Sequence, residues 1–211
     1  LMLEDTNLAG VNIAATVASS ALTQSNSTYK TITVNKGSVT VNVDPAFSAN
    51  KVTGGATNVP VGQFTMKAYG EDVKVNTLNV TFGTTTISTL NNVSLYVNGG
   101  QIGTSQNFSG SSALTFTLGS SLVIPANTTV TLTVKADIVN TSNAAYTSGT
   151  LAAKIGGVAS NAQGQSSNEV VTVASSVVTG NTLTISTGAG TFSSTTGFNA
   201  VTVAPNTTNV K

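Results

Sequence analysis

Carboxylates are the side chains with which this sequence could bind a metal ion, because it contains no His and no Cys. Glu71 and Asp72 are adjacent in a predicted turn, and Asp137 closes a predicted strand. Hard cations such as Ca²⁺ bind through several carboxylate and carbonyl oxygens. The three residues could therefore share a Ca²⁺ ion at one pole of the fold, and no other cofactor is expected. In the alternative interpretation they are solvated acids beside Lys74 and Lys135.

Enzymatic activity is not expected from this composition. Only 7% of the residues are charged, against about 25% in ordinary soluble proteins. His, Cys and Trp are absent, and the eight basic residues are all Lys. The usual nitrogen and sulfur ligands of Zn²⁺ and Fe are missing as well. We therefore predict that the chain is not an enzyme and that its folding requires neither Zn²⁺ nor Fe.

Two covalent modifications are compatible with the sequence. Lys36 and Asn168 could form an intramolecular isopeptide bond between an early and a late strand, although strand lysines are usually solvated. Glycosylation is the other, since Asn-x-Ser/Thr sequons occur at Asn26, Asn79, Asn92, Asn107, Asn127, Asn140 and Asn206. Because Asn, Ser and Thr are abundant, chance accounts for this number. The sequons thus allow a glycan without supporting one.

Tyrosines suggest a binding function as the alternative to a structural one. Tyr69, Tyr96 and Tyr146 are the aromatic residues that could stack on a sugar ring. Each is equally suited to a corner or to a sheet face, and aromatic residues make up only 5% of the chain. The alternative to a structural role is therefore an adhesin or carbohydrate-binding module on the cell surface.

The elements that must position these residues are β-strands. Apolar and polar residues alternate in several runs, which is typical of strands with one face in a core, and Asn98-Gly99 indicates a tight hairpin. A change of face near Thr77 predicts a bulge. We predict an all-β, immunoglobulin-like antiparallel β-sandwich with at least five times more strand than helix. Its core is predicted to contain Phe64, Met66, Leu78, Val80, Leu95, Phe116, Leu132 and Val134.

The sequence also repeats itself with an offset of 151 residues. The matching pairs include Ile32-Thr33-Val34 with Leu183-Thr184-Ile185, Gly37 with Gly188, Phe47 with Phe198, and Thr57-Asn58-Val59 with Thr208-Asn209-Val210. Such self-similarity indicates tandem repeats. We predict closing strands of one repeat at 1–30, a complete repeat at 31–181 and opening strands of the next at 182–211. Because the chain begins at Leu1 without a signal peptide, it is expected to be a piece of a longer protein.

Three segments resemble a known family of repeats. They are GEDVKV at 70–75, VSLYVNG at 93–99 and IPANTTVTLTVKADI at 124–138. They are similar to the tandem Ig-like β-sandwich repeats of large bacterial secreted and cell-surface proteins, as in candidate-phylum bacteria, and more loosely to S-layer and adhesin stalks. The resemblance covers residues 31–140 best. It implies an extracellular structural module and brings no catalytic residues with it.

The predicted function is therefore to build a cell-surface layer, stalk or filament by end-to-end packing of domains, with or without strand addition between subunits. The expected partners are neighbouring repeats of the same chain or copies of it. A net charge of +1 without Arg argues against nucleic acid, and no apolar run is long enough to span a bilayer. The strands of residues 183–203 are expected to pair with a neighbour, because an isolated strand pair is marginal. Residues expected to be buried in such contacts are Ile13, Val17, Phe192, Phe198 and Val203.

Overall fold

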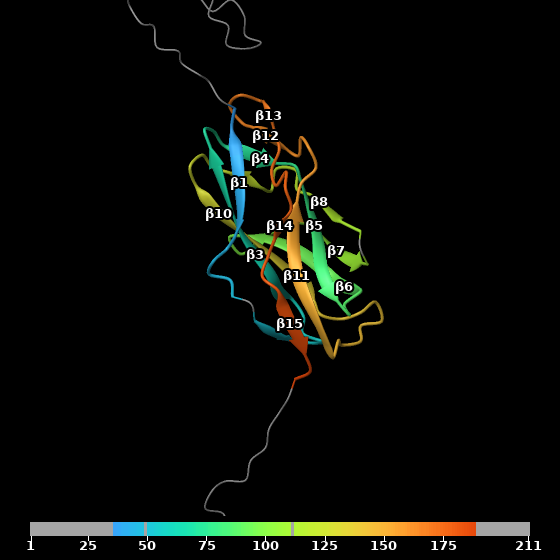
Figure 1. Ribbon diagram of the computed structural model, residues 1–211. Helices are drawn as coiled ribbons and strands as arrows, with labels where there is room; N and C mark the ends of the chain where they lie inside the picture. Colours follow the sequence, from blue (N-terminus) through green and yellow to red (C-terminus); the bar gives the residue numbers. More distant parts are fainter. Residues whose placement is uncertain (1–35, 49, 111, 189–211) are drawn as a thin grey trace, which may run out of the picture. The chain divides into compact units, whose positions relative to one another are not determined.

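The computed structural model describes residues 36–48, 50–110 and 112–188, and all regular elements among them are β-strands (Figure 1). The predicted all-β class and the excess of strand over helix are thus confirmed for these residues. The same residues include no helix long and apolar enough to cross a membrane. The strands form antiparallel sheets that pack together, with a single parallel pair between β2 and β15.

The first large sheet has five strands in the order β1-β3-β10-β6-β7. Its central pair brings core residues together, since Leu132 lies opposite Phe64 and Val130 lies opposite Met66. The strands are β1 (Ser38–Val43), β3 (Val59–Tyr69), β10 (Thr129–Asp137), β6 (Thr89–Val97) and β7 (Gly100–Ser109).

The second large sheet has the order β2-β15-β11-β5-β8, and β14 also pairs with β11. Val80 lies opposite Ile155 and Leu78 lies opposite Phe116, so this sheet also turns an apolar face inward. The strands are β2 (Lys51–Thr53), β15 (Leu183–Ser186), β11 (Ser148–Gly156), β5 (Thr77–Thr85), β8 (Leu114–Thr117) and β14 (Val178–Thr179).

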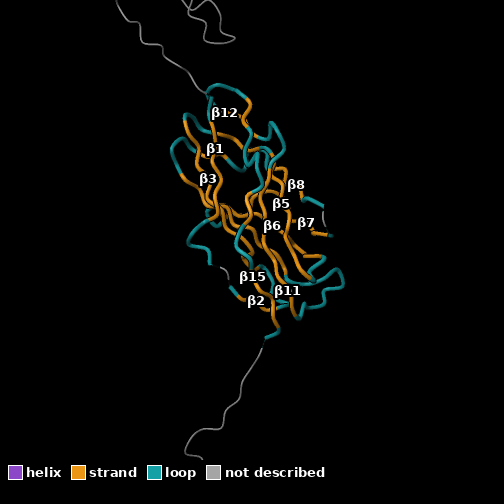
Figure 2. The backbone as a smooth tube through the Cα atoms, viewed as in Figure 1, coloured by secondary structure: helices purple, strands orange, loops and turns teal. Residues whose placement is uncertain are grey.

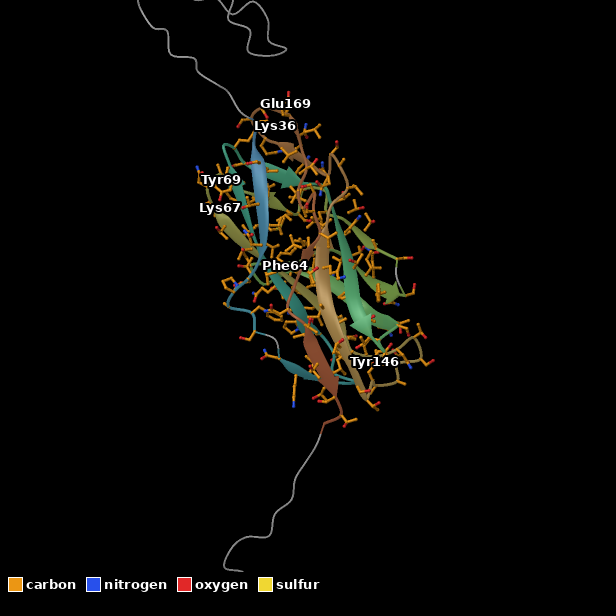
Figure 3. All side chains as sticks on the ribbon, in the orientation of Figure 1. Lys36, Phe64, Lys67, Tyr69, Tyr146 and Glu169 are labelled. Carbon is orange, nitrogen blue, oxygen red and sulfur yellow. The ribbon has the colours of Figure 1, made fainter. Side chains whose placement is uncertain are left out.

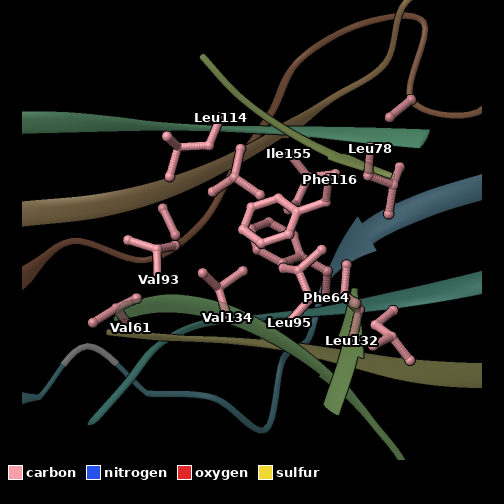
Figure 4. Packing of buried hydrophobic residues seen from close by; sticks show 14 of the residues in the cluster. Val61, Phe64, Leu78, Val93, Leu95, Leu114, Phe116, Leu132, Val134 and Ile155 are labelled. Carbon is pink, nitrogen blue, oxygen red and sulfur yellow. The ribbon is translucent and has the colours of Figure 1, made fainter. Parts of the chain in front are cut away.

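One hydrophobic core lies between the sheets, and Figure 4 shows part of it. The alternation in sequence predicts its members because side chains of a strand point alternately to its two faces. All eight predicted core residues have no exposed surface. Burying a side chain of this size stabilises the fold by about 1.5–3 kcal/mol. The ring of Phe82 meets that of Phe108 edge-on, with centroids 5.0 Å apart.

A small sheet caps the core, and it explains the change of face near Thr77. Its order is β13-β12-β4-β9, with bounds β13 (Val170–Val171), β12 (Ala162–Gly164), β4 (Val73–Val75) and β9 (Val123–Ile124). The chain leaves β4 of the small sheet and enters β5 of a large sheet at Thr77. The predicted bulge is therefore wrong, because the change of face is a passage between two sheets.

The predicted hairpin at Asn98-Gly99 is confirmed. Val97 pairs with Gly100, so the turn between β6 and β7 has two residues. Asn98 has a φ of 51° and Gly99 a φ of 83°. Asn and Gly are the residues that adopt two successive positive φ angles at least cost.

Strand β15 lies beyond residue 181, the predicted end of the complete repeat, yet it pairs inside the described domain. Leu183 is opposite Leu151 of β11, and Thr184 is opposite Lys51 of β2. Leu183 and Ile185 are buried. Residues 183–186 therefore complete this domain, and the expectation that they need a neighbour's strands is corrected. The apolar face finds its cover within the chain.

The described domain has two ends, which we call the Lys36 end and the Gly188 end. The small sheet lies at the Lys36 end, and β15 leads to the Gly188 end (Figures 1 and 2). Figure 3 shows Lys36 and Glu169 at one end, Tyr146 at the other and Phe64 between them.

Candidate functional site

The three carboxylates predicted to share a Ca²⁺ ion lie at opposite ends of the domain. Glu71 and Asp72 follow β3, whereas Asp137 bonds to Asn58, which precedes β3. The eleven residues of β3 span roughly 35 Å at the usual rise of a strand. The described ranges contain no group of three Asp, Glu, His or Cys side chains that could hold a metal ion. The shared calcium site is therefore not formed in this part of the chain.

Glu71 instead accepts four hydrogen bonds from the protein. Its Oε1 accepts from Gly37 N at 3.1 Å and from Ser167 Oγ at 2.6 Å. Its Oε2 accepts from the backbone N–H groups of Ser166 and Ser167, both at 2.8 Å. These donors, with the Ser167 hydroxyl first, lower the pKa of Glu71 from 4.5 to about 2. The ionised carboxylate thus joins three segments, which we call the Glu71 cluster: Glu71, Gly37, Ser166 and Ser167.

Two glycines make room for the Glu71 cluster. A Cβ atom on Gly37 would lie 2.7 Å from Glu71 Cγ, and one on Gly164 would collide with the carboxylate. Sequence analysis identified Glu71 but missed its donors, because Ser166 and Ser167 lie 95 and 96 residues further along the chain. The repeated glycine at position 37 was the single local signal.

Lys36 and Asn168 are near each other in the fold but are not arranged for an isopeptide bond. Lys36 Nζ donates to the backbone oxygen of Val170 at 3.3 Å. Both Lys36 and Asn168 are exposed. The neighbouring carboxylate of Glu71 is occupied by its own donors. A lysine that bonds to a carbonyl in solvent has the ordinary behaviour of a strand-end lysine.

Asp72 and Asp137 each connect loops at their own end of the domain. Asp72 Oδ1 accepts from the backbone N of Ala126 at 2.7 Å. Asp137 Oδ1 accepts from the backbone N of Asn58, and its Oδ2 from Asn92 Nδ2, both at 2.6 Å. These carboxylates act as hydrogen-bond acceptors for loops, as Glu71 does.

Tyr146 is a structural residue at the Gly188 end. Its hydroxyl donates to Thr89 O at 2.9 Å and accepts from Thr89 N at 3.2 Å. The hydroxyl thereby satisfies the first residue of β6 from a loop 57 residues away. Tyr146 is therefore fixed by the fold and is not available as a sugar platform.

Tyr69 and Tyr96 lie on the solvent face of the first large sheet. Lys67 Nζ is 5.1 Å from the ring centroid of Tyr69, and Lys135 Nζ is 4.1 Å from that of Tyr96. A cation at this distance is attracted to the face of the ring. One face of each ring is thus occupied by a lysine, which leaves less aromatic surface for stacking on a ligand.

A groove of about 520 Å³ opens between the β6–β7 hairpin and the segment around β9. Such a volume suits a small ligand. Its apolar lining comes mainly from Val97, Ile102, Leu122, Val123 and Pro125. No Asp, Glu or Lys lines the groove, so it offers shape and apolar surface without charge.

The assembly residues predicted from the repeat lie outside the described residues. They are Ile13, Val17, Phe192, Phe198 and Val203. Their burial against neighbouring domains stays a prediction, as does the division into one complete and two partial repeats.

Comparison with known proteins identifies no family. No protein-family model and no curated protein matches the chain. The structure of AvmM, described as catalysing macrocyclization in alchivemycin A biosynthesis, aligns with 74% of this chain and 92% of its own. The two chains are 10% identical, with a TM-score of 0.32. A likeness of this size supports no statement about what the present chain does.

Proposed function

We propose that the chain is part of an extracellular structural protein in which immunoglobulin-like β-sandwich domains follow one another in tandem. The proposal depends above all on the agreement between repeat and domain. The described strands run from Ser38 to Ser186, and the offset of 151 residues places the equivalent of Ser38 at Ala189. One period therefore holds one full set of strands, with two residues between consecutive sets.

So short a connection supports end-to-end packing. Three peptide steps separate Ser186 from Ala189, and they span at most about 11 Å. Consecutive domains at this separation must touch, because their side chains alone extend several ångströms from the backbone. Such contacts would build a stalk, a filament or a unit of a surface layer.

The start of the described domain supports a stiff connection. Lys36 and Gly37 match Thr187 and Gly188 in the repeat. Lys36 bonds to Val170 O, and Gly37 bonds to Glu71. A connection held by the following domain in this way has little freedom to bend.

The surface chemistry supports a location outside the cell. The chain has few charges and no Cys, and its surface relies on hydroxyl and amide side chains. The carbohydrate-binding alternative has weaker support, because Tyr146 is committed to Thr89 and the rings of Tyr69 and Tyr96 have lysines against them.

Single-molecule stretching of the natural protein on its producing cells tests the proposal. Each domain that unfolds should release one period of chain, roughly 500 Å at the extended length of a residue. We expect a series of equal steps of this size. Steps of unrelated sizes, or a single step, would contradict the tandem array.

Antibody labelling tests the location separately. An antibody raised against residues 36–188 should label intact cells as strongly as permeabilised ones. Labelling that requires permeabilisation would contradict the extracellular assignment. Equal steps together with internal labelling would leave the array standing and remove the surface role.

A further inference from the structure

The small sheet exposes a row of side chains next to Lys36. Val170, Gln163, Lys74 and Val123 are direct neighbours across β13, β12, β4 and β9. Direct neighbours project to the same side of a sheet, and the opposite side of this sheet belongs to the core. Val170 is 48% exposed and Val123 is 41% exposed. We call these four residues the outer row.

Apolar surface continues beyond the outer row. Val123 also lines the groove, together with Val97, Ile102, Leu122 and Pro125. The outer row covers three strand spacings, roughly 14 Å. The row and the groove thus form one continuous surface that a folded or extended segment could cover.

The two ends of the domain differ in exposed apolar surface. Among the described residues, the large apolar side chains with substantial exposure are Tyr69, Val123, Val158, Val170 and Val177. None of them lies in the loops at the Gly188 end, residues 54–58, 84–88 and 139–147. Exposed apolar groups concentrated on one side of a soluble domain are typical of an interaction surface.

We propose that the outer row is the docking surface for residues 1–35 of the same chain. The chain reaches Lys36 directly from these residues, and Lys36 Nζ lies 3.3 Å from the carbonyl oxygen of Val170, at one end of the row. Gly37 is fixed by Glu71, so the preceding residues leave the domain beside the row. This occupant rests on the proposed function, in which residues 1–35 close the preceding repeat.

The composition of residues 1–35 suits this surface. The segment has few charges, and apolar residues recur along it at Leu8, Val11, Ile13, Val17 and Leu22. Covering Val123 and Val170 with such residues removes apolar area from water, which favours docking. Two residues link the repeats, so docking requires no long loop to close and its entropic cost is low.

Paramagnetic NMR on the full chain tests the docking surface. The chain has no Cys, so V170C introduces a single site for a nitroxide label. We expect a severalfold loss of signal at Ile13 and Val17. Residues within about ten positions of Lys36 are not used, because chain connectivity alone keeps them near the label. The matched control is T57C, at an exposed position near the Gly188 end, which should leave Ile13 and Val17 unaffected.

Two results would overturn the proposal. Ile13 and Val17 could lose no more signal with the label at V170C than with the label at T57C. Alternatively, the loss could arise only between molecules, in a mixture of isotope-labelled chains and spin-labelled chains, which would make a second copy the occupant. Native signals from Phe64 in each variant establish that the domain is folded.

A second variant tests the surface without a label. V170K replaces an exposed apolar group by a charge and should speed amide exchange at Ile13 and Val17 severalfold, while Phe64 stays protected. Unchanged exchange would contradict docking at the outer row. Failure here leaves equal unfolding steps and surface labelling intact, so the docking surface and the proposed function fail separately.

Discussion

The two ends of the domain hold their loops together by different means. At the Lys36 end, the Glu71 carboxylate gathers N–H groups from segments that are distant in sequence. At the Gly188 end, main chain bonds to main chain: Gly54 N donates to Ser186 O at 3.0 Å, and Gly55 N donates to Ile138 O at 2.8 Å. One end therefore depends on a single ionised side chain, and the other on close approach of the backbone.

This difference determines which changes each end can tolerate. An end built on a carboxylate responds to pH and to the loss of one charge. An end built on backbone contacts responds to any atom that keeps the backbones apart. Both ends satisfy the polar groups that the strands leave at their termini, as buried or half-buried backbone groups require.

The largest effect is expected from Gly54→Ala at the Gly188 end. The added Cβ would coincide with the carbonyl oxygen of Tyr146, and a backbone atom cannot rotate away as a side chain can. We expect a loss of about 3 kcal/mol or more in the free energy of unfolding, measured by urea denaturation. Gly164→Ala, whose Cβ would meet the Glu71 carboxylate, should cost less. A larger loss for Gly164→Ala would reverse the comparison.

Tyr146→Phe should have the next largest effect. The variant removes the hydroxyl that bonds to both Thr89 N and Thr89 O and leaves these half-buried groups without that partner. The expected loss is about 1–2 kcal/mol. Tyr69→Phe is the matched control, because its ring is 40% exposed, and we expect a change within about 0.5 kcal/mol. Equal effects in the two variants would show that the Tyr146 hydroxyl contributes nothing special.

The core and the hairpin could be predicted from sequence because their signals are local. Alternation places Phe64, Leu78 and Leu132 inward whatever the partner strands are, and Asn98-Gly99 specifies its turn by its own backbone preferences. The passage from β4 to β5 was misinterpreted as a bulge for the same reason. A change of face looks alike in sequence whether a strand bulges or moves to another sheet.

The polar contacts could not be predicted because they are set by tertiary packing. Glu71 and Asp137 both stand at strand ends, and nothing local in the sequence places them at opposite ends of β3. Strand β12 (Ala162–Gly164) was missed because Ala-Gln-Gly has neither alternation nor β-branched residues. The role of β15 within its own domain followed from pairing with β11 and β2, which lie 30 and more than 130 residues away.

Glu71→Gln should separate the two ends by pH. The folded pKa of Glu71 is about 2, below its ordinary 4.5, so the carboxylate stabilises the fold above pH 4.5 and loses this contribution as the pH falls towards 2. Since the group is largely in solvent, we expect the variant to lose only about 1 kcal/mol at pH 7. Urea denaturation at pH 7 and pH 2 should show this gap closing in acid. A gap independent of pH would mean that shape, not charge, matters at Glu71.

The smallest effect is expected from removal of Ca²⁺. Six to eight oxygen ligands must converge on this ion, whereas Glu71, Asp72 and Asp137 are divided between the two ends and already accept hydrogen bonds from the protein. Melting temperatures in EDTA and in excess Ca²⁺ should therefore agree, with Mg²⁺ as the control for general ionic effects. A lower melting temperature in EDTA that Ca²⁺ alone restores would contradict this expectation. Asp72→Asn and Asp137→Asn would then locate the ion: a response abolished by only one of them assigns it to that end, and a response that survives both assigns it to acids outside the described residues, Glu4 and Asp5.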